Sequence, residues 1–367
     1  MPAHQAKKLI YFRYLTIIAL HTYLKEQVDA AVIECGMGGE YDSTNVLLSP
    51  AVAGITSLGI DHVQTLGSTI EEIAWHKAGI MKKGVSAFTS PQPKEALNVL
   101  FSRAEEKGTS LQIVNVHPQI GDGEVELGLR GDFQKINASL AVELAAHYLR
   151  SQKDLDVNTS SLPAKFRKGL KDVTLGGRCE VRVEPHLIWY IDGAHTIESI
   201  RVTSQWYSSL RAVDTGTSLV HRPRILLFNQ QTRDGTSLLK QLHDIVVSST
   251  RDDPPFTHAI FCSNVTYNSS GYRPDLISIN VDSNIVQRLQ VQHELAKGWK
   301  DLVKNSNQCQ ISVVPTIEEA VKQCRKIGLA WRNNNLDVKD VPSILAIGSI
   351  HLVGGLLDVL EESSIAG

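Results

Sequence analysis

The sequence predicts an α/β protein with mostly parallel sheets, and two observations carry this prediction. Short apolar runs of strand length alternate with stretches of helical length along nearly all of the 367 residues. The alternation is most regular in the second half, where strand-like runs are separated by stretches long enough for helices. Strands and helices that alternate in this way form a parallel sheet with helices on both faces.

The chain is long enough for two domains, each with a core of its own. We expect the first domain at 1–182 and the second at 183–367. A polar stretch, Ser151–Ser161, and the segment Gly176–Gly177–Arg178 interrupt the pattern between the two halves. The boundary is therefore placed near Arg182.

Composition excludes several classes of protein. The 37 Lys and Arg residues nearly balance the 39 Asp and Glu residues, so the net charge of −2 gives no electrostatic reason to expect nucleic acid as a partner. No apolar run reaches the roughly 20 residues that span a bilayer, and no signal-peptide pattern is present. Five scattered cysteines, none spaced C-x-x-C, favour a reducing compartment and argue against a zinc site.

The first half is expected to alternate helices with short strands. Ser68 and Thr69 are followed three residues later by Glu71 and Glu72, the pattern of overlapping capping boxes at the start of a helix. The expected helices are Leu9–Lys25, a helix from this capping box to about Lys82, and Phe133–Arg150. The expected strands are Ala30–Ile33, which leads into a glycine-rich turn, Ala51–Leu58 and Val85–Thr89.

The second half repeats the alternation more regularly. Its apolar runs are short, and helical stretches lie between and after them. The expected strands are Leu187–Ile191, Ile225–Phe228, Ala259–Cys262, Ile311–Val314 and Ile344–Ile347. We expect these strands to form one parallel sheet that is covered on both faces.

Polar residues follow four of the expected strands. In an open parallel sheet, ligands bind beyond the carboxyl ends of the strands. The residues at such ends are Glu34, Asp61 with His62, Asp192 to His195, and Asn229. One polar residue at a strand end is common, but four such ends in one chain favour a ligand site at the edge of a sheet.

Lys77 occupies an unusual position for a lysine. On its expected helix it shares one face with four apolar residues, which are Ile70, Ile73, Ala74 and Met81. One interpretation is that its stem packs on this face while its amine reaches water. The alternative is a partly buried and partly neutral amine that adds carbon dioxide. The product would be an anionic carbamate that can face metal ions.

Three further positions have both a functional and an ordinary interpretation. Glu34 offers oxygen ligands suited to magnesium, or is a loop or helix-capping carboxylate. His62 is a second candidate ligand, or a turn histidine. Arg178 is a phosphate clamp, or a surface arginine in a linker.

The run Gly36–Gly39 fits a nicotinamide-dinucleotide motif poorly, because the third glycine of G-x-G-x-x-G would fall at Tyr41.

Together these stretches closely resemble the folylpolyglutamate synthases, a family of the Mur ligase superfamily. The matching stretches occur in family order across nearly the whole chain. They are Tyr11–Thr16, Glu34–Asn45, Ile55–His62, Glu71–Ile80, Gly131–Ala138, Asp192–His195, Phe228–Asp234 and Gly348–Gly355. The combination of Tyr41–Asn45 with Phe228–Asn229 is similar to the eukaryotic, polyglutamylating members.

The resemblance implies a Mur-ligase-type P-loop ATPase domain followed by a Rossmann-like C-terminal domain with a mostly parallel sheet. It implies an ADP-forming ligase that adds L-glutamate to the γ-carboxylate of tetrahydrofolate and its polyglutamates through an acyl phosphate. The implied cofactors are ATP and magnesium, with potassium as a further candidate. The implied protein is a monomer of the cytoplasm or of mitochondria that acts on small molecules, a reduced folate, L-glutamate and ATP.

The resemblance also assigns roles to individual residues. It implies that Glu34 and His62 hold magnesium and that Lys77 is the carbamylated lysine of the catalytic site. The residues that it places at ATP are Arg178, Asp192, His195 and Asn229. Of these, His195 lies near the phosphates and has a catalytic role, while Asn229 lies towards the adenosine end.

The chain departs from the family pattern in two places. Leu175 and Gly176 stand where the family has tryptophan and proline. A phosphate-binding loop of the form G-x-x-x-x-G-K-[ST] does not occur in the chain, which contains no Gly-Lys dipeptide. We therefore expect an N-terminally truncated polypeptide with an incomplete ATPase domain. The alternative to an active ligase is a catalytically inactive homologue, or an incomplete gene model, with at most weak nucleotide binding.

Overall fold

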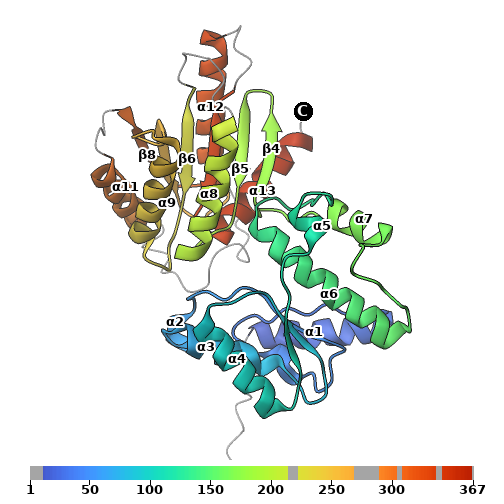
Figure 1. Cartoon of the computed structure of the whole chain (residues 1–367). Coiled ribbons are helices and arrows are strands. Elements are labelled where there is room, and N and C mark those ends of the chain that lie inside the picture. The colour runs from blue at the N-terminus through green and yellow to red at the C-terminus, as the bar shows by residue number, and fades with distance from the viewer. Residues whose placement is uncertain (1–10, 214–221, 268–288, 304–307, 336–340, 366–367) are drawn as a thin grey trace, which may run out of the picture. The chain divides into compact units, whose positions relative to one another are not determined.

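The computed structural model describes residues 11–213, 222–267, 289–303, 308–335 and 341–365 (Figure 1). The chain divides into two compact units, which are described separately. Unit 1 comprises Met1–Glu126 and Lys135–Gly169, and unit 2 comprises Leu127–Gln134 and Leu170–Gly367. Arg182 lies inside a strand of unit 2. The division into an ATPase domain and a ligase domain remains a prediction.

Unit 1 contains a small parallel sheet with strands in the order β1-β2-β3. Its strands are β1 (Ala53–Ile55), β2 (Ala87–Thr89) and β3 (Leu111–Ile113). Its helices are α1 (Tyr11–Glu26), η1 (Ser43–Val46), α2 (Val63–Leu66), α3 (Ile70–Lys77), η2 (Ala78–Ile80), α4 (Lys94–Lys107), α5 (Pro118–Gly121), α6 (Phe133–Lys153) and α7 (Ala164–Asp172), of which α6 and α7 cross the division between the units.

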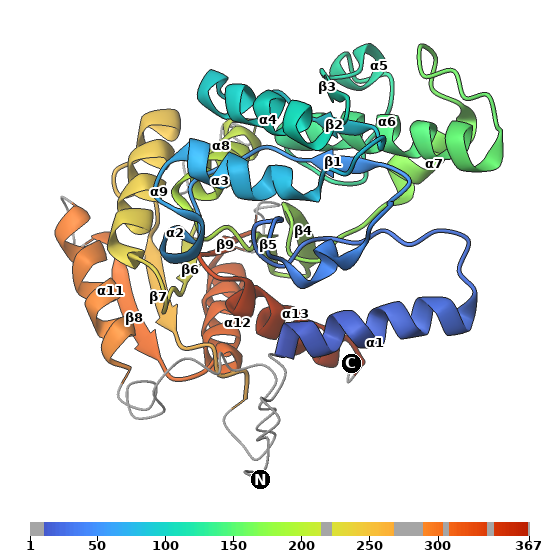
Figure 2. The same ribbon diagram turned by 90° about the horizontal axis from the view of Figure 1, so that it is seen from below.

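The core of unit 1 has one cluster on each face of this sheet. On one face, small residues of the strands meet α3 and α4, which pack side by side (Figure 2). Ala74, Ala87 and Ala96 are fully buried there, so the backbones approach closely. On the other face, Phe88 contacts Leu140 of α6. The sheet is therefore covered on both faces.

Helix α1 contributes no buried residue to this core. Its apolar side chains point in all directions, and Tyr14 and Ile17 are each 54% exposed. Figure 2 shows it as a long single helix near the start of the described chain. A helix that is apolar on every side is typical of a buried environment. Helix α1 is thus apolar on every side, although none of its residues is buried against the other described residues.

Unit 2 contains a six-stranded sheet in the order β4-β5-β9-β6-β7-β8. All neighbouring strands are parallel except β4 and β5, which are antiparallel. The strands are β4 (Glu180–Glu184), β5 (Leu187–Ile191), β6 (Arg224–Phe228), β7 (His258–Cys262), β8 (Gln310–Val314) and β9 (Ser343–Ile347). The helices are α8 (Ile197–Val213), α9 (Gly235–Thr250), α11 (Gln290–Leu302), α12 (Ile317–Asn334) and α13 (Ile350–Ile365).

The alternation of side chains divides the core of unit 2 into two layers. Tyr190 and Phe228 face the layer formed with α8, α9 and α11. Trp189 and Leu227, their neighbours in sequence, face the layer formed with α12 and α13. Because every central strand is buried on both faces, its sequence reads as a continuous apolar run. The predicted α/β class with a mostly parallel sheet is confirmed.

One predicted strand is wrong, and one helix is shorter than predicted. Residues 30–35 have no regular structure, and Val32 is 96% exposed. No described strand pairs with this segment, and an apolar run alone does not make a strand. Helix α3 ends at Lys77 because the carbonyl of His76 accepts a hydrogen bond from the backbone N–H of Glu40, 2.8 Å away. In a continued helix that carbonyl would bond to Ile80.

None of the helices in the described residues is both long and apolar enough to cross a membrane.

Two of the observed strands were not predicted. β3 has only three residues, and β4 is an edge strand that alternates apolar and charged positions.

Candidate functional site

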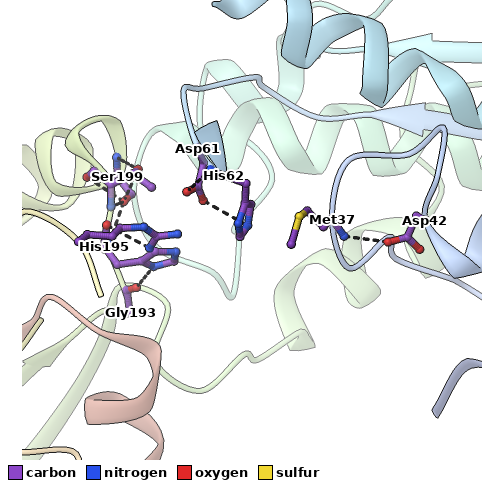
Figure 3. Close-up of polar contacts among 9 residues, drawn as sticks. Met37, Asp42, Asp61, His62, Gly193, His195 and Ser199 are labelled. Atoms are coloured by element: carbon purple, nitrogen blue, oxygen red, sulfur yellow. Dashed lines mark hydrogen bonds and ion pairs between the residues drawn. The ribbon is translucent and has the colours of Figure 1, made fainter. Parts of the chain in front are cut away.

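The glycine-rich run of unit 1 forms a turn that is closed by Asp42. Its Oδ1 accepts hydrogen bonds from the backbone N–H of Thr44 at 2.9 Å and from the Thr44 hydroxyl at 2.6 Å. Its Oδ2 accepts the backbone N–H of Met37 at 2.8 Å (Figure 3). Asp42 also caps η1. This carboxylate therefore joins both ends of the turn and fixes its shape.

The same turn rests on the carboxyl end of α3. The side chain of Asn45 donates to the carbonyls of Glu40 and Gly79, at 3.0 and 3.2 Å. A methyl group added at Gly39 would lie 2.6 Å from the His76 carbonyl oxygen, and one at Gly79 would lie 2.3 Å from the Cα of Glu40. Both positions therefore require glycine, because the two backbones approach so closely.

Cys35, the residue that follows Glu34, is half-buried. Glu34 is exposed and Lys77, the last residue of α3, is half-buried. Burial raises the pKa of the Cys35 thiol, which also senses the charges of Lys77 and Glu34. The Thr44 hydroxyl oxygen, whose proton is donated to Asp42, lies 3.3 Å from Sγ of Cys35. Among the described residues, no hydrogen bond or ion pair joins the predicted metal ligand Glu34 to the predicted carbamate lysine, Lys77.

His62 has the left-handed backbone conformation, with φ of 52°, which is uncommon for a residue other than glycine. Its backbone N–H donates to Asp61 Oδ1 at 2.7 Å, and its Nε2 lies 3.6 Å from Asp61 Oδ2 (Figure 3). No hydrogen bond or ion pair among the described residues joins His62 to Glu34 or Lys77. Among these residues, no three His, Cys, Asp or Glu side chains are grouped as a metal site.

In unit 2, Asp192 follows β5 and is only 4% exposed. Its Oδ2 accepts the N–H of Cys179 at 2.7 Å, and its Oδ1 accepts the N–H of Ala194 at 2.8 Å and the hydroxyl of Thr203 at 3.0 Å. Burial raises the pKa of Asp192, and these hydrogen bonds oppose part of the rise. Because both carboxylate oxygens are occupied, Asp192 holds two turns together: the one before β4 and the one after β5.

These two turns bring Arg178 and His195 together. The N–H of Gly193 donates to the carbonyl of Gly177 at 2.9 Å, and that carbonyl also accepts a guanidinium N–H of Arg178 at 3.2 Å. Nδ1 of His195 lies 2.7 Å from the carbonyl oxygen of Gly193 (Figure 3). Since a carbonyl only accepts, the neutral ring carries its proton on Nδ1 and presents Nε2 as an acceptor.

Asn229 follows β6 and is fully buried within a chain of amides. Its Nδ2 donates to Asn264 Oδ1 at 2.7 Å, and its Oδ1 accepts from Gln292 Nε2 at 2.9 Å. Asn264 in turn donates to Gln231 at 3.2 Å. Both functional atoms of Asn229 are therefore engaged within the protein.

Gly348 links the two halves of this site at the end of β9. Its N–H donates to the carbonyl of Ala194 at 3.0 Å, and its own carbonyl accepts from Gln230 Nε2 at 2.8 Å. Because β9 lies between β5 and β6, Gly348 joins the turns that follow both of its neighbours. The chain reverses its strand order here, and such a switch point is where open α/β sheets bind ligands.

The sequence missed several residues of this cluster. Asn264 and Gly348 follow predicted strands, so the strand-end rule used for Asn229 would have found them as well. Gln292 lies in the first turn of α11, and no sequence pattern marks it.

A comparison with models of protein families gives no match. Among curated proteins, the folylpolyglutamate synthase of Neurospora crassa is 40% identical over 360 residues, which cover 97% of this chain and 65% of that protein. The chain is a homologue of these folylpolyglutamate synthases over nearly its whole length. The folylpolyglutamate synthase of Saccharomyces cerevisiae is likewise 40% identical over 362 residues, with 97% of the chain and 62% of the relative covered. The chain thus spans less than two thirds of the length of these relatives.

Solved structures of folylpolyglutamate synthases share the fold. The Mycobacterium tuberculosis enzyme complexed with ADP superimposes with a TM-score of 0.68 at 23% identity, covering 95% of this chain and 71% of that one. Escherichia coli FolC in complex with DHPP and ADP gives a TM-score of 0.65 at 21% identity, covering 97% and 72% of the two chains. The α/β architecture of both units therefore has experimental counterparts in the family.

Proposed function

We propose that the polypeptide acts as a folylpolyglutamate synthase, an ATP-dependent ligase that adds L-glutamate to the γ-carboxylate of a reduced folate. The observation that carries this proposal is the 40% identity over 97% of the chain, which runs through both units. The proposal inherits its substrates from these relatives. By the same similarity, we propose a monomeric protein of the cytoplasm or of mitochondria.

The proposed reaction proceeds in two steps. A γ-carboxylate oxygen of the folate attacks the γ-phosphorus of ATP, and ADP leaves, which gives an acyl phosphate. The amine of L-glutamate then attacks the acyl carbon, phosphate leaves, and the amine loses a proton to complete the amide. Negative charge develops on the transferring phosphoryl group in the first step and on the acyl oxygen and the departing phosphate in the second, so cationic groups that face these atoms lower the barrier.

The residues of unit 2 suit the nucleotide in this proposal. Arg178 supplies a charge for phosphate, and His195 presents Nε2 because Nδ1 is held by Gly193. Asp192 and Asn229 are buried with their polar atoms engaged. We propose that these two shape the nucleotide site by orienting its turns.

Unit 1 supplies the proposed metal ligands. Magnesium usually keeps several waters and binds one or two protein groups together with substrate phosphates. Glu34 is exposed and offers carboxylate oxygens, and the imidazole of His62 is 40% exposed, so the donor set fits an ion that arrives with a nucleotide. Bound there, magnesium would neutralise phosphate charge. Lys77, the last residue of α3, is the proposed site of the carbamate.

Nucleotide binding without ligation is the second candidate function. The observation that favours it is that all four residues assigned to ATP, namely Arg178, Asp192, His195 and Asn229, lie in unit 2. The proposed ATP residues therefore all belong to one compact unit.

An assay of the purified chain separates the two functions. The chain is incubated with ATP, magnesium, tetrahydrofolate and labelled L-glutamate, beside Lys77→Ala and the neighbouring exposed Lys83→Ala as a control. Turnover that is lost only in Lys77→Ala supports the ligase. The absence of turnover from the folded wild-type chain rejects ligase activity for this chain.

A binding measurement decides the second function. A fluorescent ADP analogue is titrated into the wild-type chain, Arg178→Ala and the control Arg201→Ala, which changes an exposed arginine of α8. We expect weaker binding in Arg178→Ala alone. Equal binding by all three proteins would exclude Arg178 from the nucleotide site.

A further inference from the structure

Arg103 of α4 is a buried arginine outside all the residues assigned so far. Its side chain is only 7% exposed, and it bridges two carboxylates. One guanidinium nitrogen lies 2.6 Å from Glu40 Oε2, and another lies 2.6 Å from Glu106 Oε2. The guanidinium carbon lies 4.4 Å from the centre of the Trp75 ring. Arg103 thus connects α4 to both α3 and the glycine-rich turn.

Glu40 joins the glycine-rich turn to both α3 and α4. Its backbone N–H bonds to the last turn of α3 at His76, and its side chain bonds to Arg103 and, at 3.0 Å, to Lys107 of α4. Tyr41, the next residue, places its ring 6.2 Å from that of Trp75. The segment that begins at Glu34 is therefore held against the Lys77 end of α3 by one buried cation and its neighbours.

We propose that Arg103 is a positioning residue that seats the turn on α3 and so sets Glu34 relative to Lys77. Burying a charged pair contributes little net stability, because removing the charges from water costs about as much as their attraction returns. Such a pair does fix geometry, since Arg103 has a defined place only when Glu40 lies against it. The catalytic consequence rests on the proposed ligase function, but the seating of the turn does not.

Cys35 provides a reporter of this seating that is independent of activity. It is half-buried between Glu34 and the turn, whereas Cys179, Cys262, Cys309 and Cys324 are buried. If the turn lifts from α3, the thiol of Cys35 becomes accessible while the other four remain protected. If the whole chain unfolds, all five react. Alkylation followed by peptide mass spectrometry distinguishes these cases.

The experiment compares Arg103→Met with Glu106→Gln in the full chain. Glu106 is 62% exposed and touches Arg103 from α4 itself, so its substitution changes the arginine's other partner and leaves Glu40 in place. We expect alkylation of Cys35 to rise at least about tenfold in Arg103→Met, which corresponds to about 1.4 kcal/mol of lost local stability. We expect less than about a twofold change in Glu106→Gln, as for a surface ion pair.

Two further variants keep the proposal testable if Arg103→Met unfolds. Glu40→Gln removes the charge of the turn while leaving the arginine, and we expect the same selective exposure of Cys35. Arg103→Lys restores a cation and should recover part of the protection. Unchanged Cys35 reactivity in folded Arg103→Met, or in Glu40→Gln if the arginine variant unfolds, would overturn the proposal. So would equal effects of Arg103→Met and Glu106→Gln.

Where the chain turns over, a kinetic readout follows from the same variants. We expect kcat to fall in Arg103→Met while the KM for ATP changes little, because the residues assigned to ATP lie in unit 2. A rise in KM for ATP with kcat unchanged would contradict a positioning role beside Lys77. If even the wild-type chain lacks turnover, the ligase proposal fails while the thiol measurement still decides the role of Arg103.

Discussion

Asn229 shows how a single residue serves a site without being exposed to it. Its amide is held from both sides, by Asn264 on the neighbouring strand end and by Gln292 of α11. The residue therefore has one orientation, which the strand-end rule did not predict. That rule identifies Asn229 from its place after β6, but the partner Gln292 depends on how α11 packs, and local sequence does not record this.

Gln292→Leu tests this amide chain. The substitution keeps the approximate size of the side chain but leaves Oδ1 of Asn229 buried without a donor, which costs about 1–3 kcal/mol. We expect the free energy of unfolding of unit 2 to fall by about that amount in urea titrations. Gln290→Leu is the matched control, since Gln290 is exposed and its side chain donates to Glu294 at 3.1 Å on the same helix. Equal losses in the two variants would contradict a structural role for the chain of amides.

Glu72 gives a pH-dependent prediction. Hydrogen bonds from Thr69 and Ser68 in the capping box lower the pKa of Glu72 below its ordinary value of 4.5. A lowered pKa in the folded state means that the contribution to stability is complete above 4.5 and is lost as pH falls through the folded-state pKa. We expect Glu72→Gln to lose stability less steeply than the wild type below pH 4.5.

The measurement is the urea midpoint of unit 1 at neutral pH and at several values below 4.5. The control is Glu71→Gln, because Glu71 also lies in the first turn of α3 but takes no part in the capping box. Identical acid dependence in the wild type and Glu72→Gln would show that the box contributes nothing in this window.

At the scale of elements, buried strands were predicted more accurately than exposed ones. The five predicted strands of the second half all exist and differ from the predicted bounds by at most one residue. Four of them, β5, β6, β7 and β9, lie inside the sheet and are buried, so their predicted stretches are apolar throughout, while β8 lies at the sheet edge and is only half-buried. β4 was missed because its apolar and charged residues alternate. The strand expected at Ala30–Ile33 is absent because strand formation needs a pairing neighbour, which a local pattern does not reveal.

Gly348→Ala tests the turn that joins β9 to α13. Gly348 has φ of 112°, and an added Cβ would lie 2.6 Å from the Phe228 ring and 2.7 Å from the carbonyl oxygen of Asn229. We expect a loss of about 1–3 kcal/mol in the stability of unit 2 from backbone strain alone, together with weaker binding of the ADP analogue.

The matched control for this variant is Gly354→Ala in the middle of α13. Nothing lies within 4 Å of a Cβ at that position. Replacing glycine by alanine inside a helix stabilises it by about 0.5–1 kcal/mol. Thermal denaturation should therefore move in opposite directions for the two variants. A destabilised Gly354→Ala, or an unchanged Gly348→Ala, would show that these steric relations do not govern stability.

At the scale of the whole molecule, the two units differ in how fully their sheets and helices are buried. Unit 2 has a full apolar layer on each face of its sheet, with residues such as Leu227 and Phe261 entirely buried. Unit 1 has a sheet of three short strands, and its first helix has no buried residue. The sequence predicted the helical period of α1, but periodicity alone cannot say what covers a helix.

The exposed apolar side chains of α1 should affect how strongly molecules of this chain attract one another in solution. A net charge of −2 supplies little mutual repulsion, so attraction between apolar helices should dominate encounters between molecules. We expect a negative osmotic second virial coefficient in static light scattering. Ile17→Glu on α1 should raise it towards zero, and Val183→Glu, which adds the same charge at a 75% exposed position of β4, should raise it less. Equal shifts would mean that charge, and not the helix surface, sets the solution behaviour of the chain.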